Sequence, residues 1–228
     1  MLTFHLITLF PESFDSYLGA SIVKRAQERG IISVKMYNPR DFVAVPKGKK
    51  ATYADRRVDN RPYGGGPGMV IEALPVIRAV EAAIGKKMRN ATGAKKVRIV
   101  FFNPAGKQFS NEVAESFKKY TDIVLVCGRY EGIDARIKKA FPMADLSVGP
   151  YVLTGGELPA MIVIDTVTRR IPGVLGKDAS VEELRIASPD VYTRPEVIEH
   201  KGKKLRVPKI LLSGHHAKMD EWKMKKKK

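Results

Sequence analysis

The chain has 228 residues, of which 41 are Lys or Arg and 24 are Asp or Glu, so its formal net charge is +17. Its hydrophobic content of 44% is ordinary for a globular protein with a sizeable core. The apolar runs are far shorter than the roughly 20 residues of a membrane-spanning helix. One cysteine excludes an internal disulfide, four histidines without Cys partners do not form a zinc pattern, and residues 1–10 lack the features of a secretory signal. We therefore expect a cytoplasmic protein with no membrane span and no structural metal.

The excess of basic residues, with an isoelectric point near 9.9, indicates a polyanionic partner. Clustered cations displace condensed counterions from a phosphate backbone and so bind nucleic acid without sequence choice. The alternative is that lysines only confer solubility, and residues 225–228 are a plain lysine tail. We favour nucleic acid, although the charge does not say which one.

The first half of the chain shows two apolar strand patterns, each followed by a helical pattern. We expect strands at residues 3–9 and 31–37 and helices at 11–29 and 72–83. Pro11 suits the first turn of a helix and Gly30 ends it. Between these elements, residues 38–68 are too rich in Gly, Pro, Arg and Lys to be regular, and a loop of that length is usually functional.

Strand and helix patterns also alternate in the second half, which predicts a parallel α/β sheet. The expected strands are 97–102, 123–127 and 145–148, and the expected helices are 111–120, 133–140 and 157–170. We divide the chain into a main domain at 1–173, an irregular linker at 174–204 and a small C-terminal domain at 205–228, with a strand at 207–212 and a helix at 216–226.

Three glycine-rich loops follow predicted strands, at residues 103–106, 128–132 and 149–156. In α/β sheets ligands bind at the carboxyl edge of the strands, and glycine lets the backbone approach a ligand closely, so these loops predict a site for a small cofactor. A fourth glycine-rich segment, YGGGPGM at 63–69, is neither a P-loop nor a Rossmann fingerprint. Its backbone either approaches a ligand closely or forms a tight surface turn.

Several strings in collinear order resemble the tRNA (guanine-N1)-methyltransferase family of the SPOUT class. They are NPRDF at 38–42, RPYGGGPGM at 61–69 after Asp59, VCGRYEGID at 126–134, YVLTGGELPA at 151–160, IPGVLG at 171–176, YTRPEV at 192–197 and LSGHH at 212–216. The resemblance covers nearly the whole chain. It implies a mostly parallel sheet flanked by helices with a C-terminal trefoil knot, a small helical C-terminal domain and a homodimer with its active site at the subunit interface.

The same resemblance implies methyl transfer from S-adenosylmethionine to N1 of the guanine immediately 3′ of the tRNA anticodon, with Mg²⁺ needed for activity. The implied cofactor contacts are Phe101, Phe102, Pro104, Gly128, Glu131, Val148, Gly149, Pro150, Tyr151, Val152 and Leu153. Pro150 stands where the family usually has an aspartate. Glu131 resembles the glutamate that faces the cofactor and is linked to magnesium; the alternative is a carboxylate at a helix start.

The chemistry needs a base for the guanine N1 proton and a cation for the charge that develops on the exocyclic oxygen. Arg169 resembles the family's cation, whereas the alternative is that Arg169 or Arg170 only caps a helix. The family's base is an aspartate after Ser-x-Glu-Glu, and here Leu184 takes that position. Our hypothesis is that Glu183 is the base, with Glu182 and Asp190 as alternatives. Otherwise the glutamates are solvated charges on a flexible segment.

Further matches imply contacts with tRNA, and they are Arg40, Asp59, Arg61, Tyr63 and Arg194. Tyr63 either stacks on a flipped base or packs within its own loop. The family continues with more helix after the position of Trp222, so we expect a shortened C-terminal domain. The competing hypothesis is a catalytically altered SPOUT protein that binds RNA and S-adenosylmethionine without turnover.

Overall fold

The computed structural model describes residues 1–44, 48, 52, 54–85, 96–175 and 190–226. The chain divides into two compact units, Met1–Val174 and Leu175–Lys228. No helix of the described residues is long and apolar enough to cross a membrane.

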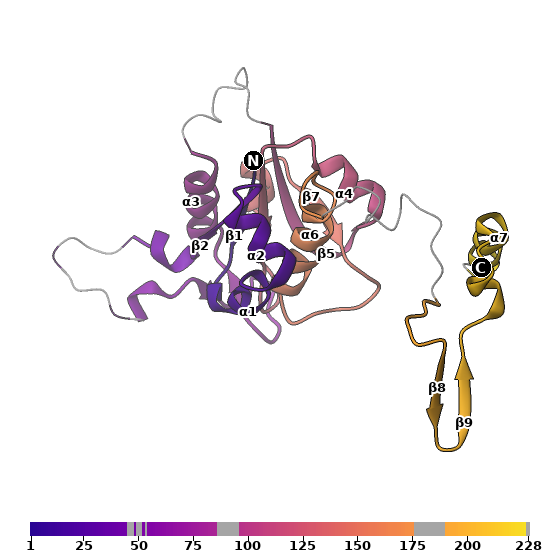
Figure 1. The fold of residues 1–228 in the computed structure, drawn as a ribbon. Helices are drawn as coiled ribbons and strands as arrows, with labels where there is room; N and C mark the ends of the chain where they lie inside the picture. The colour runs from indigo at the N-terminus through magenta and orange to yellow at the C-terminus, as the bar shows by residue number, and fades with distance from the viewer. Residues whose placement is uncertain (45–47, 49–51, 53, 86–95, 176–189, 227–228) are drawn as a thin grey trace. The chain divides into compact units, whose positions relative to one another are not determined.

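The first unit is built on a five-stranded sheet of order β2-β1-β6-β5-β7, and all neighbouring strands run parallel (Figure 1). Its strands are β1 Leu2–Ile7, β2 Ile32–Tyr37, β5 Val97–Gln108, β6 Asp122–Val126 and β7 Ala144–Ser147. A short antiparallel pair, β3 Asp59–Asn60 and β4 Val70–Ile71, lies outside this sheet. The predicted parallel α/β sheet is therefore confirmed, and the trefoil knot stays a prediction.

Helices cover both faces of the sheet (Figure 1). The α-helices of this unit are α1 Asp15–Leu18, α2 Ser21–Glu28, α3 Ala73–Ile84, α4 Asn111–Phe117, α5 Ile137–Ala140 and α6 Glu157–Thr168, and the 3-10 helices are η1 Pro11–Phe14, η2 Pro39–Phe42 and η3 Ala54–Arg56. Alternate residues of β6 enter two cores: Ile123 packs with α2, α4 and α6, whereas Val124 packs with α3 and α5. Both faces of the central strands are buried, as in parallel sheets covered by helices on each side.

Three predicted elements differ most from the structure in their bounds. The helix predicted at 11–29 breaks into η1, α1 and α2, because Ala20 is extended and Ser21 has a φ of 48°. The strand predicted at 97–102 continues to Gln108, with a register shift against β7 between Phe102 and Lys107. The helix predicted at 133–140 begins only at Ile137, because Ile133 forms a β-bridge with Ile71.

The second unit contains an antiparallel hairpin as well as helices. Its elements are β8 Val197–His200, β9 Lys203–Arg206, the 3-10 helix η7 Lys209–Leu212 and α7 His216–Lys226. The hairpin lies largely in the segment predicted to be irregular, and the strand predicted at 207–212 is wrong, because η7 begins there after Pro208. The rings of Tyr192 and Trp222 pack at 6.3 Å between centroids. The C-terminal domain predicted at 205–228 is thus mainly helical, with η7 and α7, and it also contains the end of β9.

Candidate active site

A cavity of about 440 Å³ lies at the carboxyl edge of β5, β6 and β7. The three predicted glycine loops form its walls, since its lining includes residues from 101–104, 128–133 and 146–156. Cavities of this size commonly hold small molecules, and this edge of a parallel sheet is where they bind. The sequence-predicted cofactor loops are therefore brought together around one cavity.

Most of the predicted cofactor contacts line this cavity. They are Phe101, Phe102, Pro104, Gly128, Glu131, Val148, Gly149, Tyr151, Val152 and Leu153. Pro150 is exposed and is not among the described lining residues. Sequence reasoning did not single out Arg129, Lys138 or Leu146, which also line the cavity. Lys138 and Leu146 lie outside the glycine loops, so no motif marked them.

Two glycines allow the walls to pack closely. A Cβ on Gly156 would lie 2.5 Å from Cys127 Cα, and a Cβ on Gly106 would lie 2.6 Å from the backbone nitrogen of Leu146. The Gly156 N–H donates to the Gly128 carbonyl at 2.9 Å, which ties the loop before α6 to the loop after β6. A side chain at either position would push these segments apart.

One end of the cavity carries a small charged cluster. Lys138 Nζ donates to Asp145 Oδ2 at 2.6 Å and lies 4.5 Å from the centroid of the Phe101 ring. The Asn103 amide nitrogen donates to the same carboxylate oxygen at 2.9 Å. Partial burial favours the neutral carboxyl, but the hydrogen bonds from Lys138 and Asn103 outweigh it and lower the pKa of Asp145. The cluster therefore holds the loop after Phe102 against β7.

The fourth glycine-rich segment reaches the cavity through Glu131. The Glu131 N–H donates to the Met69 carbonyl at 3.0 Å, and a Cβ on Gly68, which has a φ of 83°, would lie 2.5 Å from Glu131 Oε1. Only glycine fits there. By contrast, a Cβ on Gly65 would meet no atom of the described residues within 4 Å, so that part of the segment is an open turn. The turn interpretation thus fits the part around Gly65, and close approach to a ligand stays a prediction. Glu131 precedes α5 by several residues, so it is not a carboxylate at a helix start.

Comparison with known sequences decides the family. Residues 2–228 match the family described as tRNA (Guanine-1)-methyltransferase TrmD. The chain belongs to this family. It is 42% identical over 223 residues to the tRNA (guanine-N(1)-)-methyltransferase of Clostridioides difficile, covering 96% of this chain and 89% of that protein. The enzyme of the same name from Pelotomaculum thermopropionicum is 43% identical over 221 residues, with 95% and 81% covered. That from Geobacter sulfurreducens is 41% identical over 227 residues, with 98% and 85% covered.

The predicted function is thereby confirmed: this tRNA (guanine-1)-methyltransferase is an enzyme, and membership of its family implies S-adenosylmethionine as methyl donor. Of the candidate catalytic residues of the methyltransferase, Arg169 lies in the described part of the first unit. Arg169 follows α6, where its N–H donates to the Asp165 carbonyl at 3.0 Å, and it is not among the described lining residues. Its neighbour Arg170 has a side chain only 6% exposed and lies 3.7 Å from Glu115 on α4, so it joins two helices.

The structure does not test the candidate bases. Glu182 and Glu183 lie outside the described residues. Asp190 is exposed and belongs to the second unit. The hypothesis that Glu183 removes the guanine proton therefore stays a prediction.

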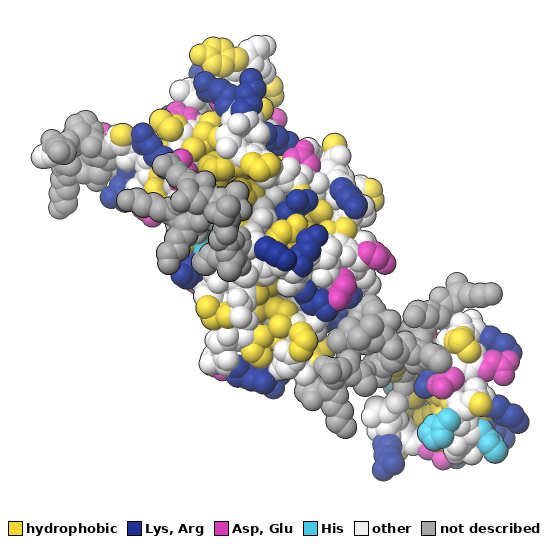
Figure 2. All heavy atoms as spheres, turned by 90° about the horizontal axis from the view of Figure 1, so that it is seen from above, with side chains coloured by type: hydrophobic (Ala, Val, Ile, Leu, Met, Phe, Trp, Pro, Cys, Tyr) yellow, Lys and Arg dark blue, Asp and Glu magenta, His cyan; other side chains and the backbone are white. Residues whose placement is uncertain are grey.

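The candidate tRNA contacts of the methyltransferase differ in exposure. Tyr63 is fully exposed at 102%, so it does not pack within its own loop. Arg61 is also exposed, Arg40 lies half-buried in η2, and Asp59 lies 3.3 Å from Arg57. Figure 2 shows Lys and Arg side chains in separate groups over the surface, between apolar patches.

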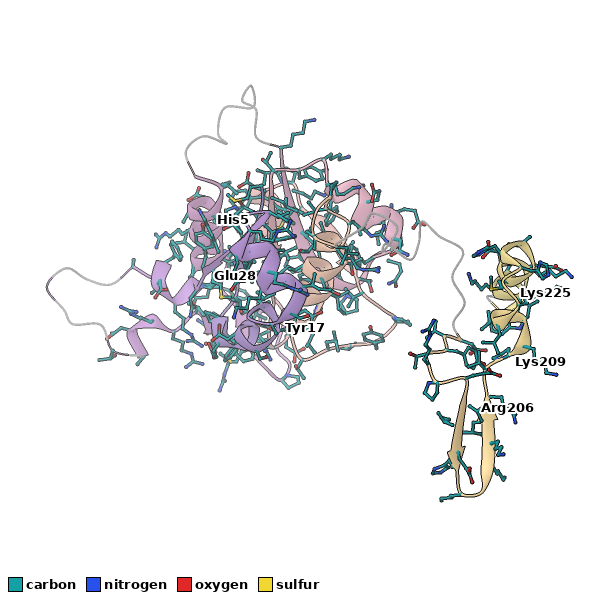
Figure 3. All side chains as sticks on the ribbon, in the orientation of Figure 1. His5, Tyr17, Glu28, Arg206, Lys209 and Lys225 are labelled. Atoms are coloured by element: carbon teal, nitrogen blue, oxygen red, sulfur yellow. The ribbon has the colours of Figure 1, made fainter. Side chains whose placement is uncertain are left out.

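In the second unit Arg194 is exposed. The side chains of Arg206, Lys209 and Lys225 extend from this unit into solvent (Figure 3). Exposed cations of this kind suit contacts with phosphates, which position a protein on RNA without reading its sequence.

Proposed function

We propose that this enzyme methylates N1 of the guanine immediately 3′ of the tRNA anticodon, with S-adenosylmethionine held in the cavity between the three glycine loops. The observation that carries this proposal is that cavity of about 440 Å³, which is lined by residues of loops 103–106, 128–132 and 149–156 at the carboxyl edge of the parallel strands. Backbone groups of such loops can hydrogen-bond an adenine or a ribose at close range.

The residues present fit the cofactor. Phe102, Ile133 and Leu146 give the cavity apolar surface, and Asn103 and Ser147 give it polar groups. This mixture suits a nucleoside with a charged methionine end. Because Pro150 lies outside the described lining, the proline in place of the family's aspartate leaves the cavity walls intact.

When bound, S-adenosylmethionine supplies the electrophilic methyl group. The protein must then hold guanine in place, accept its N1 proton and stabilise the negative charge on the exocyclic oxygen. We assign charge stabilisation to Arg169 and proton removal to Glu183, with Glu182 and Asp190 as the alternatives. Replacement of Glu183 by Gln should abolish methyl transfer while S-adenosylmethionine still binds. Full activity of this variant would exclude Glu183 as the base.

A homodimer is supported by an apolar hollow on the outer face of α6. Its apolar lining residues are Tyr17, Tyr151, Leu153, Leu158, Met161 and Ile162. Leu158 is 54% exposed and Val152, on the neighbouring loop, is 83% exposed. Contiguous exposed apolar patches mark interaction surfaces. Because Tyr151 and Leu153 also line the cofactor cavity, a second copy seated on this face would border the active site.

We also propose a role for Mg²⁺ beside Glu131. The described residues contain no group of three or more His, Cys, Asp or Glu that could hold a metal ion. Mg²⁺ usually keeps several waters and binds through one or two carboxylates together with the substrate, so Glu131 on the cavity wall is sufficient as a protein ligand.

For tRNA we propose two contact regions. Arg40, Asp59, Arg61 and Tyr63 lie in the segments between β2 and β4 and would contact the target guanine and its neighbours. Arg194 and the basic residues of the second unit, which includes the hairpin β8–β9 and the predicted C-terminal domain at 205–228, would contact phosphates. The net charge of +17 supports a polyanionic substrate.

The test is transfer of a labelled methyl group to an unmodified tRNA transcript with guanine 3′ of the anticodon, with Mg²⁺, beside a transcript that lacks this guanine. Activity on the first transcript alone supports the proposal. Binding of S-adenosylmethionine and RNA without transfer to either transcript would instead favour the catalytically altered protein.

A further inference from the structure

A buried carboxylate joins the segments behind the cofactor cavity. Glu157 is the first residue of α6, and its side chain is only 4% exposed. The Thr8 hydroxyl donates to Glu157 Oε1 at 2.9 Å, and Arg129 Nε lies 2.9 Å from Glu157 Oε2. Thr8 follows β1 and Arg129 follows β6. One carboxylate therefore ties together the ends of two strands and the start of a helix.

Arg129 is fixed from two sides. Its guanidinium carbon lies 4.7 Å from the centroid of the Phe10 ring, and its Nε forms an ion pair with Glu157 Oε2 whose geometry is not that of a hydrogen bond. Its backbone forms an antiparallel bridge with Gly155. A Cβ on Gly155 would lie 2.5 Å from Glu157 Oε2, so the absence of a side chain at 155 leaves the space that the ion pair fills. Arg129 and Gly155 both line the cavity, whereas Glu157 is not among its described lining residues.

We propose that Glu157 is a positioning residue for cofactor binding, which acts by holding Arg129 so that loops 128–132 and 154–156 keep the separation that the cofactor needs. The proposal rests on the function proposed above for the cavity. A buried carboxylate needs partners, because an uncompensated charge in the interior is strongly unfavourable. The alternative is that Glu157 only stabilises the fold, so the test must separate positioning from stability.

The fold offers a matched control at the other end of the same strand. Asp122, the first residue of β6, is buried, lies 3.0 Å from His5 Nε2 and accepts a hydrogen bond of 2.7 Å from the Thr121 hydroxyl. It thus resembles Glu157 in burial and in having one basic and one hydroxyl partner. Unlike Glu157, Asp122 lies at the end of β6 that is away from the cavity, because the cavity wall follows the other end of this strand.

The experiment compares Glu157→Gln with Asp122→Asn in the full chain. The measurements are the Kd for S-adenosylmethionine by calorimetry, the KM and kcat for methyl transfer, and the unfolding temperature. Glu157→Gln keeps an acceptor for Thr8 but loses the charge that pairs with Arg129. We therefore expect the Kd and the KM for the cofactor to rise about tenfold or more, because small misplacements of a binding wall have effects of this order. Asp122→Asn should lower the unfolding temperature and leave the Kd within about twofold of wild type.

A second pair keeps the test decisive if Glu157→Gln does not fold. Thr8→Val removes the hydroxyl that donates to Glu157 and accepts from the Phe10 N–H, and it should raise the Kd about threefold. Thr8→Ser keeps a hydroxyl for both hydrogen bonds and should restore the wild-type Kd. If wild type itself does not bind S-adenosylmethionine, the proposed function of the cavity is wrong. If wild type binds it and Glu157→Gln or Thr8→Val binds equally well, the cavity assignment stands and the positioning role is wrong.

Discussion

Helix α6 begins so close to the end of β6 that an alanine at position 156 should disturb both the fold and the cavity. Gly156 has φ −85° and ψ −4°, a conformation open to any residue, so the backbone itself does not require glycine. The space does. An added Cβ would lie 2.5 Å from Cys127 Cα and 3.0 Å from the Gly128 nitrogen, whereas carbon atoms prefer to lie about 3.5–4.0 Å apart.

The magnitude follows from which atoms must move. Both neighbours are backbone atoms at the end of a buried strand, so they cannot turn aside as a side chain would. Overpacking of this kind lowers the free energy of unfolding by about 1–3 kcal/mol. In a unit of this size each kcal/mol corresponds to roughly 2–4 °C, so Gly156→Ala should unfold about 4–8 °C below wild type for a loss of about 2 kcal/mol.

Gly128→Ala is the matched control. Its added Cβ would meet Ile133 Cγ1 at 3.6 Å, an ordinary contact, so its unfolding temperature should stay within about 2 °C of wild type. Because Gly128 lines the cavity, the added methyl group should nevertheless make this variant bind S-adenosylmethionine more weakly than wild type does. Scanning calorimetry and cofactor titration of both variants provide the check. Gly156→Ala with wild-type stability and affinity would refute the close packing of α6 on β6.

Three further outcomes are expected. Burial, and to a smaller extent the Glu157 carboxylate, raises the pKa of the Cys127 thiol well above its usual value. At pH 8 this thiol should therefore react with Ellman's reagent at least about tenfold faster in denaturant than in the native protein, and equal rates would contradict this. Ile162→Glu on the apolar face of α6 should turn a dimer into a monomer in light scattering and lower methyl transfer, and an unchanged mass would count against that interface. Replacing four hairpin cations with Gln should reduce the salt dependence of tRNA binding by about 3 in log–log slope, and an unchanged slope would exclude the hairpin from phosphate contact; the four are Lys201, Lys203, Lys204 and Arg206.

The sheet and the cavity loops could be predicted because their signals are local. All residues of β1 and β6 are buried, and their sequences LTFHLI and DIVLV are correspondingly apolar. Glycine clusters after such strands mark the carboxyl edge, where ligands bind in parallel sheets. The loop of residues 128–132 could therefore be predicted to line a cavity from its sequence and its place after a buried strand.

Elements set by distant pairing were not predictable in the same way. Residues 133–136 have a helical pattern, but Ile133 pairs with Ile71, and the Asp134 N–H donates to the Ile71 carbonyl at 2.9 Å. The hairpin β8–β9 was missed for another reason. Its residues are almost all exposed, so its sequence VIEHKGKKLR lacks the alternation that a half-buried strand shows.

The chemistry of the site depends on such distant contacts even more than the fold does. Thr8 and Glu157 are 149 positions apart, and no spacing rule connects them. Arg169 is the opposite case, a residue that a motif predicts but the cavity does not include. The motif predicts it to be the catalytic cation, and it is not among the described residues that line the cavity. Helix α6 ends beside Arg169, and the apolar hollow on its outer face is also lined by Tyr151 and Leu153. These two residues line the cavity as well. A second copy on this face would therefore border the cavity, so we expect catalysis to require the dimer even where cofactor binding does not.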